Sequence, residues 1–171
     1  MKRNNFIFRV CCILLFICVG CNSMRDKDLL GSVMSLAVGN DYAAYVDGMG
    51  KLHILYDDAN ATEGVDLEKT YQSLGADPFC LVAVDGTVIV EDVEINHCVS
   101  SSEAWVDIAS LAVAGDTVVG LKKDGTVVAV CKTGSDQGQC DVGEWTGIAA
   151  VGTNGNVTVG VKNNGEWVST K

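Results

Sequence analysis

The chain has 171 residues, enough for one domain, and its 12 basic and 22 acidic side chains give a formal net charge of −10. Proteins that bind nucleic acid usually present a basic stripe to the phosphate backbone, whereas the longest basic run here is Lys122-Lys123. The acidic balance therefore argues against a nucleic-acid partner.

The first twenty residues have the pattern of a secretory signal peptide. Lys2, Arg3 and Arg9 supply a positive start, and residues 10–20 form an uninterrupted apolar run of eleven. That run is shorter than the about 20 residues that cross a bilayer, but it is typical of the apolar region of a signal. We expect residues 1–20 to be a signal peptide, with a buried core helix as the alternative.

The apolar run ends at Cys21 in a pattern that resembles a bacterial lipobox. In that motif small residues precede a cysteine that is lipidated and becomes the new N-terminus. Val19 and Gly20 match the motif, whereas Cys18 stands where leucine is preferred. We expect acyl chains such as palmitate on Cys21, which would anchor the chain because each buried methylene adds about 0.8 kcal/mol. Ordinary signal cleavage is the alternative.

Lipidation would place the protein on the cell membrane, facing outside the cytoplasm, with residues 21–32 as the lipidated N-terminus and tether. Without residues 1–20 the chain keeps 9 basic and 22 acidic residues, a net charge of −13. Such acidity is expected to keep an exported protein soluble.

Four cysteines remain beyond the leader and the lipidation site: Cys80, Cys98, Cys131 and Cys140. An even number in an oxidising compartment predicts disulfides. Three pairings are possible; Cys131–Cys140 is favoured because it closes a short loop, and Cys80–Cys98 by parallel position. Free buried thiols are the alternative. Zinc is disfavoured because tetrathiolate sites usually contain cysteines about two to four residues apart.

Four copies of one apolar pattern fill residues 33–171. Each copy has short runs rich in Val, Ile and Thr, which favour strands, around a polar turn that ends in glycine. The turn glycines recur at intervals of 36, 39 and 40 residues, at Gly50, Gly86, Gly125 and Gly165. A period in this range indicates a repeat architecture. We place the repeats at about 33–66, 67–104, 105–144 and 145–171.

The last two copies are the most alike, because Trp105 and Trp145, like Gly120 and Gly160, lie forty residues apart. In the third copy we expect strands at Ile108–Val113, Thr117–Leu121 and Thr126–Val130. The turn glycine between the last two supplies the positive φ of a tight hairpin. Glycines at 115, 120, 155 and 160 predict bulges or close backbone approaches. The single helix candidate is Asp66–Leu74.

The third copy resembles the repeat of the regulator of chromosome condensation family, in its bacterial exported branch. The residues that match are Trp105-x-x-Ile108, then Lys122-Lys-Asp-Gly-Thr-Val-Val128, then Gly138-Gln139. The resemblance is close over Trp105–Lys171 and looser over Val33–Val90. It implies an all-β fold of β-propeller-type repeats with one four-stranded blade each, and hence about four blades.

Propellers of this family usually have seven blades, so four repeats imply an incomplete ring. Propellers with about four blades exist, but exposed edge strands are a liability that proteins normally cover. Three interpretations stay open: a truncated gene product, one half of a dimeric ring, or an arc sealed by a partner.

No pattern predicts catalysis, a metal or a cofactor. His53 and His97 lie outside metal-binding spacings, and a nucleophilic pair of His97 with Cys98 is disfavoured because such pairs rarely adjoin in sequence. The acidic groups, such as Asp136 to Asp141, lack the alternation of a calcium loop.

The large aromatic residues divide into two kinds. Trp105 and Trp145 recur with the repeat, so we expect them to pack between blades. Trp167 stands where the other repeats have Val127, Val88 or Leu52, and it is a possible contact residue because tryptophan is frequent in interface hot spots.

Taken together, these patterns predict a non-enzymatic, membrane-anchored binding module for a protein partner or for self-association. Loops Asp92–Ala104 and Lys132–Val142 would carry its specificity, since loops on rigid scaffolds usually do. The alternatives are an exported hydrolase that works in a propeller channel and a remnant without independent function.

Overall fold

The computed structural model describes residues 33–39, 42–57, 65–76, 78–90, 92–100 and 102–171. The chain divides into two compact units, Met1–Val33 and Met34–Lys171, and the strands lie in the second unit, with Val33 at the boundary. The predicted signal peptide and the lipidation site Cys21 lie outside the described residues. No helix among the described residues has the length and apolar character needed to cross a membrane.

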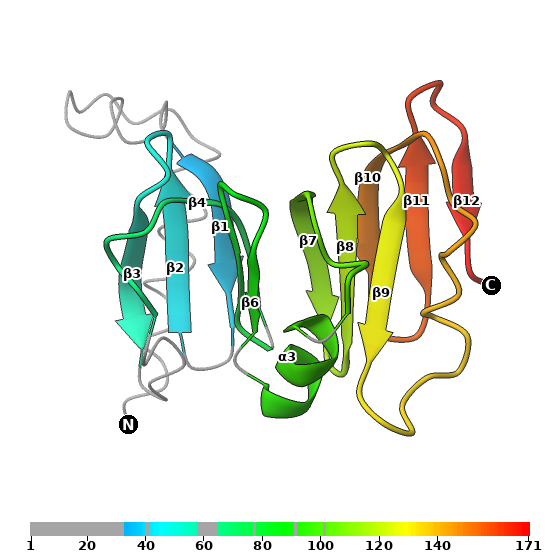
Figure 1. Ribbon diagram of the computed structural model, residues 1–171, viewed down its shortest axis with the longest axis horizontal. Coiled ribbons are helices and arrows are strands. Elements are labelled where there is room, and N and C mark those ends of the chain that lie inside the picture. The colour runs from blue at the N-terminus through cyan, green and yellow to red at the C-terminus, as the bar shows by residue number, and fades with distance from the viewer. Residues whose placement is uncertain (1–32, 40–41, 58–64, 77, 91, 101) are drawn as a thin grey trace, which may run out of the picture. The chain divides into compact units, whose positions relative to one another are not determined.

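Four three-stranded antiparallel sheets, blades 1 to 4, follow one another along the chain (Figure 1). Blade 1 contains β1 (Val33–Val38), β2 (Tyr42–Asp47) and β3 (Leu52–Asp57). Blade 2 contains β4 (Tyr71–Gly75), β5 (Cys80–Ala83) and β6 (Val88–Val90). Blade 3 contains β7 (Ile108–Ala114), β8 (Thr117–Lys122) and β9 (Val127–Cys131). Blade 4 contains β10 (Ile148–Thr153), β11 (Thr158–Lys162) and β12 (Trp167–Ser169).

Consecutive blades pack on one another: β2 contacts β4, β4 and β5 contact β7, and β7 and β8 contact β10. Within the described residues, the series runs from blade 1 to blade 4 without closing into a ring. The all-β fold of four propeller-type blades is confirmed. In the part of the chain that the structure describes, however, each blade has three strands and not the four that the resemblance implies.

The second and third strands of every blade are joined by the predicted glycine turn. The turn glycines of the four blades all have positive φ, between 82° and 87°. In blade 3 the side chain of Asp124 braces the turn by accepting a hydrogen bond from the Thr126 amide at 2.9 Å. Aspartate and asparagine commonly stabilise turns in this way, and Asp85 and Asn164 do the same in blades 2 and 4.

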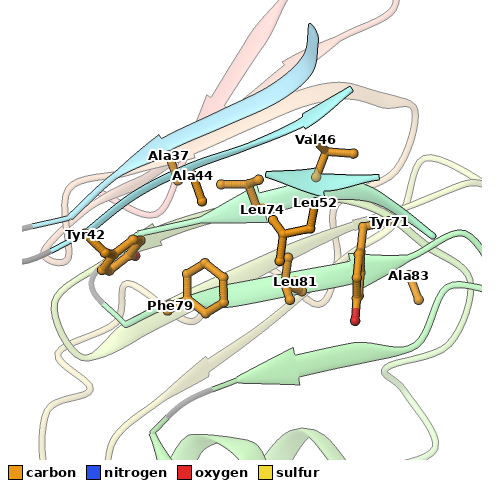
Figure 2. Close-up of a cluster of buried hydrophobic side chains, with 10 residues drawn as sticks. All are labelled: Ala37, Tyr42, Ala44, Val46, Leu52, Tyr71, Leu74, Phe79, Leu81 and Ala83. Carbon is orange, nitrogen blue, oxygen red and sulfur yellow. The ribbon is translucent and has the colours of Figure 1, made fainter. Parts of the chain in front are cut away.

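The hydrophobic core is divided into three layers, one between each pair of consecutive blades. The first layer joins blades 1 and 2, where the rings of Tyr42 and Phe79 meet edge to face with centroids 5.0 Å apart (Figure 2). The second layer joins blades 2 and 3 and includes Trp105, and the third joins blades 3 and 4 with Trp145 packed against it. Both tryptophans therefore contribute to packing between blades, as expected.

Each of these tryptophans lies over a glycine of its own blade. A Cβ atom at Gly120 would lie 2.8 Å from Cζ3 of Trp105, and one at Gly160 would lie 3.0 Å from the ring of Trp145. The two strand glycines thus leave room for an indole ring rather than for another backbone. This contact explains why tryptophan and glycine recur together at the forty-residue period.

The predicted helix is wrong in position. Residues 71–74 of the candidate Asp66–Leu74 form β4, in which Tyr71 is buried and pairs with Ala83 of β5. Among the described residues, a helix lies instead at α3 (Val93–Ser100), inside the segment expected to be a loop. Ile95 and Val99, four residues apart, turn its apolar side into the second core layer. Pairing within blade 2 overrides the weak helical propensity of the earlier segment.

Candidate functional site

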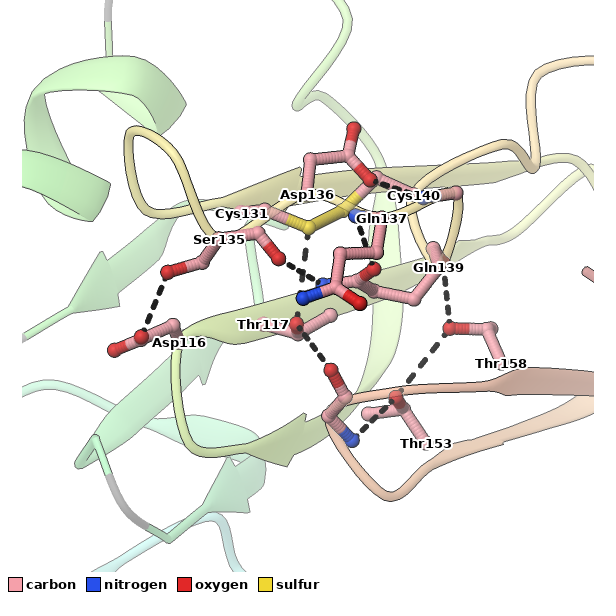
Figure 3. Close-up of a disulfide and its surroundings, with 12 residues drawn as sticks. Asp116, Thr117, Cys131, Ser135, Asp136, Gln137, Gln139, Cys140, Thr153 and Thr158 are labelled. Atoms are coloured by element: carbon pink, nitrogen blue, oxygen red, sulfur yellow. Dashed lines mark hydrogen bonds between the residues drawn. A yellow bond between two sulfur atoms is a disulfide. The ribbon is translucent and has the colours of Figure 1, made fainter.

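The predicted disulfide between Cys131 and Cys140 is present, with a Cα–Cα distance of 6.6 Å (Figure 3). Cys131 is the last residue of β9, and the bridge joins it to Cys140, so that residues 132–139 form a closed loop. We call the segment Lys132–Val142 the disulfide loop. The bridge ties this loop to the end of a core strand.

The second predicted pair, Cys80–Cys98, is wrong. Cys80 lies buried in the central strand of blade 2, within the second core layer, and its thiol donates a hydrogen bond to the Pro78 carbonyl at 3.3 Å. Cys98 is exposed on α3. Neither sulfur atom takes part in a disulfide.

The disulfide loop is ordered by a buried side chain, Gln139, which is 2% exposed. Its Nε2 donates to the carbonyl oxygen of Ser135 at 2.7 Å, and its Oε1 accepts from the amide of Gln137 at 2.7 Å. The backbone carbonyl of Gln139 accepts a hydrogen bond from the hydroxyl of Thr158 in blade 4 at 2.8 Å. A fully bonded buried amide fixes the loop on itself and on the neighbouring blade.

A second set of contacts fixes the disulfide loop to α3. Nζ of Lys132 lies 2.9 Å from Oδ2 of Asp92, and the amide of Thr133 donates to Oε1 of Glu94 at 2.7 Å. The structure therefore brings together the two segments that were predicted to carry specificity. We call the disulfide loop, α3, the turn 114–116 of blade 3 and the turn 153–157 of blade 4 the disulfide rim.

Charge and hydrogen bonding stabilise the ionised forms at this junction. The Ile95 amide, followed by the Lys132 ammonium group, holds the pKa of Asp92 below its ordinary value. Hydrogen bonds from Thr133 lower the pKa of Glu94, and the bond to Asp92 raises the pKa of Lys132. All three side chains therefore stay charged across the physiological range.

A polar depression of about 400 Å³ lies on the disulfide rim. Its lining consists of small and amide-bearing residues with one carboxylate: Ala114, Gly115, Asp116, Gly134, Ser135, Gln137, Gln139, Asn154, Gly155 and Asn156. That carboxylate, on Asp116, accepts a hydrogen bond from the Ser135 hydroxyl at 2.8 Å. The lining offers donors and acceptors for hydrogen bonding, but its described residues include no histidine, lysine or thiol.

The carboxylate of Asp136 approaches the two sulfur atoms of the Cys131–Cys140 bridge, so that the three candidate ligand atoms lie within 4.8 Å of one another. Metal ions bind cysteine as the thiolate. Both sulfur atoms are committed to the disulfide here, so this group does not form a metal site.

A second depression, of about 440 Å³, lies beside the turn of blade 1 and includes Asp47 and Glu68. Oδ1 of Asp47 accepts from the amides of Met49 and Lys51, and its Oδ2 lies 2.7 Å from Nε2 of His53. The bond to His53 is the main cause that lowers the pKa of Asp47. Both carboxylate oxygens of Asp47 are therefore engaged in hydrogen bonds that stabilise the turn between β2 and β3.

The remaining residues of interest are not among the lining residues of these depressions. His53 stacks on Tyr45 in blade 1, with ring centroids 4.6 Å apart, and His97 is exposed on α3. Trp167 is 70% exposed on β12, the last strand of blade 4. Its exposure agrees with a contact role, which stays a prediction.

Asp92 should link the two halves of the rim in a pH-dependent way. Its Oδ1 accepts from the Glu94 and Ile95 amides and so caps α3, while Oδ2 meets Lys132. Because folding lowers its pKa, the stability it contributes is present above the ordinary value of 3.8 and is lost as the pH falls below it. Asp92→Ala should cost about 0.5–2 kcal/mol at neutral pH.

The matched variant Asp92→Asn keeps an oxygen for the cap but removes the charge. Its loss should be smaller, and it should flatten the acid limb of a plot of unfolding free energy against pH. Urea titrations between pH 3 and 7 measure both effects. An acid limb unchanged in Asp92→Asn would contradict the assignment.

No family model and no curated protein matches the chain. Among solved structures, Prp20p from Saccharomyces cerevisiae, also called yeast RCC1, has 14% identity and a TM-score of 0.57 over 84% of this chain and 45% of its own. The CRINKLY WD40 ectodomain of the receptor kinase ACR4 from Arabidopsis thaliana has 13% identity and a TM-score of 0.55, over 80% and 49%. The computationally designed Ika4 protein has 16% identity and a TM-score of 0.53, over 81% and 89%.

At these identities the similarity shows the fold alone. The chain spans about half the length of the two natural structures. It spans most of the designed one. The chain therefore has an RCC1-like repeat fold of propeller blades.

Proposed function

We propose that this protein is an exported, lipid-anchored binding module that acts without catalysis and contacts a protein partner through the disulfide rim. The observation that carries the proposal is the bracing of that rim. The disulfide, the buried Gln139 and the Lys132–Asp92 pair fix two otherwise irregular segments on the blades. A surface ordered in this way loses little conformational entropy when it binds.

The chemistry of the rim favours a polar, positively charged partner surface. Asp116, Asp136 and Asp141 are exposed there, together with the amide side chains of Gln137 and Asn156. Aligned opposite charges raise association rates and exclude partners with like charge. Similar folds support a protein as the partner, since the structure of Prp20p was described with its binding to Gsp1p and histones.

Export and lipid anchoring rest on the sequence before Asn22. The Cys131–Cys140 disulfide supports export, because such bonds persist mainly in oxidising compartments. A hydrolase would need several catalytic groups that converge on one hollow. In the described lining of the rim depression the only carboxylate is that of Asp116, which is engaged by Ser135. The depression of blade 1 includes the carboxylates of Asp47 and Glu68, but both oxygens of Asp47 are engaged by the Met49 and Lys51 amides and by His53. The binding role is therefore the better supported one.

The test is covalent capture on intact cells that produce the full chain. Proteins cross-linked to the wild type are identified, and their yield is then compared with two rim variants, Gln137→Arg and Asn156→Arg. Both side chains are exposed on the rim. We expect the yield of a true partner to fall at least tenfold, because an added cation opposes a positively charged surface.

Thr146→Arg is the matched control, since it adds the same charge at an exposed position near the start of β10, away from the rim. Equal capture by wild type and rim variants, or an equal loss in the control, would contradict the proposal. Fractionation of the same cells tests the anchor: Cys21→Ser should leave the membrane fraction, and its retention there would contradict lipidation.

A further inference from the structure

One position of the repeat contacts the following blade in blades 1 to 3. It lies two residues after the turn glycine and is occupied by Leu52, Val88, Val127 and Trp167. The first three are 4%, 8% and 3% exposed, each in the core layer shared with the next blade. Trp167 is 70% exposed. The fourth blade therefore presents, uncovered, a position that is buried between blades elsewhere.

The rest of the same face of blade 4, hereafter its front face, follows the same rule. Val119 and Leu121 of blade 3 are buried in the layer shared with blade 4. Forty residues later, Val159 and Val161 are 38% and 41% exposed. The front face of blade 4 is therefore an exposed apolar surface, and surfaces of this kind usually mark interaction sites.

Backbone hydrogen bonds also join the turn glycines of blades 1 and 3 to the blade that follows. The carbonyl of Gly50 accepts a hydrogen bond from the amide of Tyr71 at 2.7 Å, and that of Gly125 accepts from Ile148 at 2.9 Å. In each case the donor is the first residue of the next blade. A Cβ atom at Gly165, the equivalent glycine of blade 4, would meet nothing within 4 Å among the described residues.

The opposite end of the series carries the complementary surface, the back face of blade 1. In blade 3 the equivalent face packs on blade 2, where a Cβ atom at Gly75 would lie 2.5 Å from Cγ2 of Val113. The glycine thus accepts a valine of the following blade. The repeat aligns Val113 with Val38 of β1, which is 39% exposed.

The front face of blade 4 has a glycine at the matching position. Gly152 of β10 takes the place of Gly75 in the strand register, since both lie four residues after the start of the first strand of their blade. A Cβ atom at Gly152, unlike one at Gly75, would meet nothing within 4 Å among the described residues. An exposed valine at one end of the series and an open glycine at the other reproduce the contact that joins blades 2 and 3. The two ends are therefore shaped for each other.

We propose that the front face of blade 4 is covered by the back face of blade 1 from a second copy of this chain. Two copies would meet head to tail through two equal interfaces, because a heterologous contact closes into a ring when its rotation permits. The result is a ring of eight sheets, twice the four of one chain. The chain covers 45% and 49% of the length of two natural structures with similar folds, so each of them is about twice as long as this chain. This assembly is independent of the partner proposed for the disulfide rim.

The first experiment measures the mass of the full chain in mild detergent by analytical ultracentrifugation and native mass spectrometry. The wild type should be a dimer. Trp167→Glu and Val38→Glu should each weaken the dimer at least tenfold, because each places a charge in both interfaces. Val106→Glu is the matched control: Val106 is 50% exposed and lies outside both end faces, so this dimer should persist.

Mixing the two monomeric variants distinguishes the geometry. A Trp167→Glu chain keeps an intact back face, and a Val38→Glu chain keeps an intact front face, so a mixed dimer has one undamaged interface. Mixing should therefore restore association. A dimer of two front faces would instead be unaffected by Val38→Glu and would not recover on mixing, and either result would overturn the proposal.

A photoreactive phenylalanine analogue at position 167 identifies the occupant directly. In an equal mixture of heavy- and light-isotope chains, cross-links should join residue 167 to β1 or β3 of the other copy. A wild-type monomer, or cross-links only to a different protein, would show that the proposal is wrong. Circular dichroism of each variant separates loss of assembly from loss of folding.

Discussion

Replacing Trp105 with alanine should lower the free energy of unfolding by about 3–5 kcal/mol, the usual cost of removing a large buried aromatic side chain. Trp105 is 8% exposed and belongs to the layer that joins blades 2 and 3. Its removal leaves a cavity against Ile108 and Val118, which are fully buried in β7 and β8 and cannot readily move inward.

Gly120 makes the test specific. A Cβ atom there would lie 2.8 Å from Cζ3 of Trp105 and 3.2 Å from Cδ1 of Ile108. In the wild type, Gly120→Ala should therefore cost about 1–3 kcal/mol, as overpacking does. In the Trp105→Ala background the 2.8 Å contact is relieved, whereas those with Val128 at 3.1 Å and Ile108 at 3.2 Å remain, so the same change should cost clearly less than in the wild type.

Chemical denaturation of the four proteins of this cycle measures the coupling between the two positions. Residues in direct contact usually couple by about 0.5–3 kcal/mol. The exposed neighbour Val106 supplies a control, since Val106→Ala should change stability by no more than about 0.5 kcal/mol. Additive effects of Trp105→Ala and Gly120→Ala would contradict the packing described.

The same contact explains why the sequence predicted the fold well. The tryptophan ring occupies the space above the strand glycine, so the two residues depend on each other. Their shared period of forty residues therefore indicates a repeated structural unit and not merely a biased composition. The turn glycines do the same, because only a residue that tolerates a φ near 85° fits the hairpin. The turn glycines mark all four blades, whereas the tryptophan–glycine contact marks blades 3 and 4.

The errors arose where long-range packing decides the structure. Residues 66–74 have no strong local signal, and the pairing of Tyr71 with Ala83 determines their conformation. Helix α3 carries a signal that could have been used: Asp92 as the cap, followed by Ile95 and Val99 at helical spacing. Its eight residues are too few for periodicity alone to reveal it.

The prediction of the candidate site likewise succeeded where local sequence decides the structure and failed where long-range packing does. Loop closure identified the Cys131–Cys140 bridge, whereas parallel position could not reveal that Cys80 faces the core and Cys98 does not. The contact of Lys132 with Asp92 joins two blades and leaves no trace in local sequence. Trp167 departed visibly from its repeat, and its exposure in blade 4 gives that departure a structural meaning.

Removing the disulfide should have the second large effect. The bridge closes a loop with a sequence separation of 9. Restricting a loop of this size in the unfolded chain is worth about 2.5–3 kcal/mol in the chain-entropy model. The variant with both Cys131→Ala and Cys140→Ala should therefore unfold at a lower denaturant concentration by a corresponding amount, provided that Thr117 and Gln139 remain packed.

The loss should also be local. Gln139 is held from within the loop by Ser135 and Gln137, so without the bridge these bonds must order the loop alone. Amide hydrogen exchange over 132–142 should accelerate, while β8, buried in the middle of blade 3, should keep its protection. If the rim binds the partner, capture should fall together with this protection.

Chemical reduction breaks the Cys131–Cys140 bridge without changing the sequence, so it provides a control for the alanine substitutions. A reductant should lower the stability of the wild type to that of the double alanine variant and leave the variant itself unchanged. Cys98→Ser, at an exposed position on α3, should respond to the reductant as the wild type does. A wild type that loses no stability when its disulfide is fully reduced would show that the bridge does not stabilise the rim. The bonds of Gln139 and the Lys132–Asp92 pair would then be sufficient to order it.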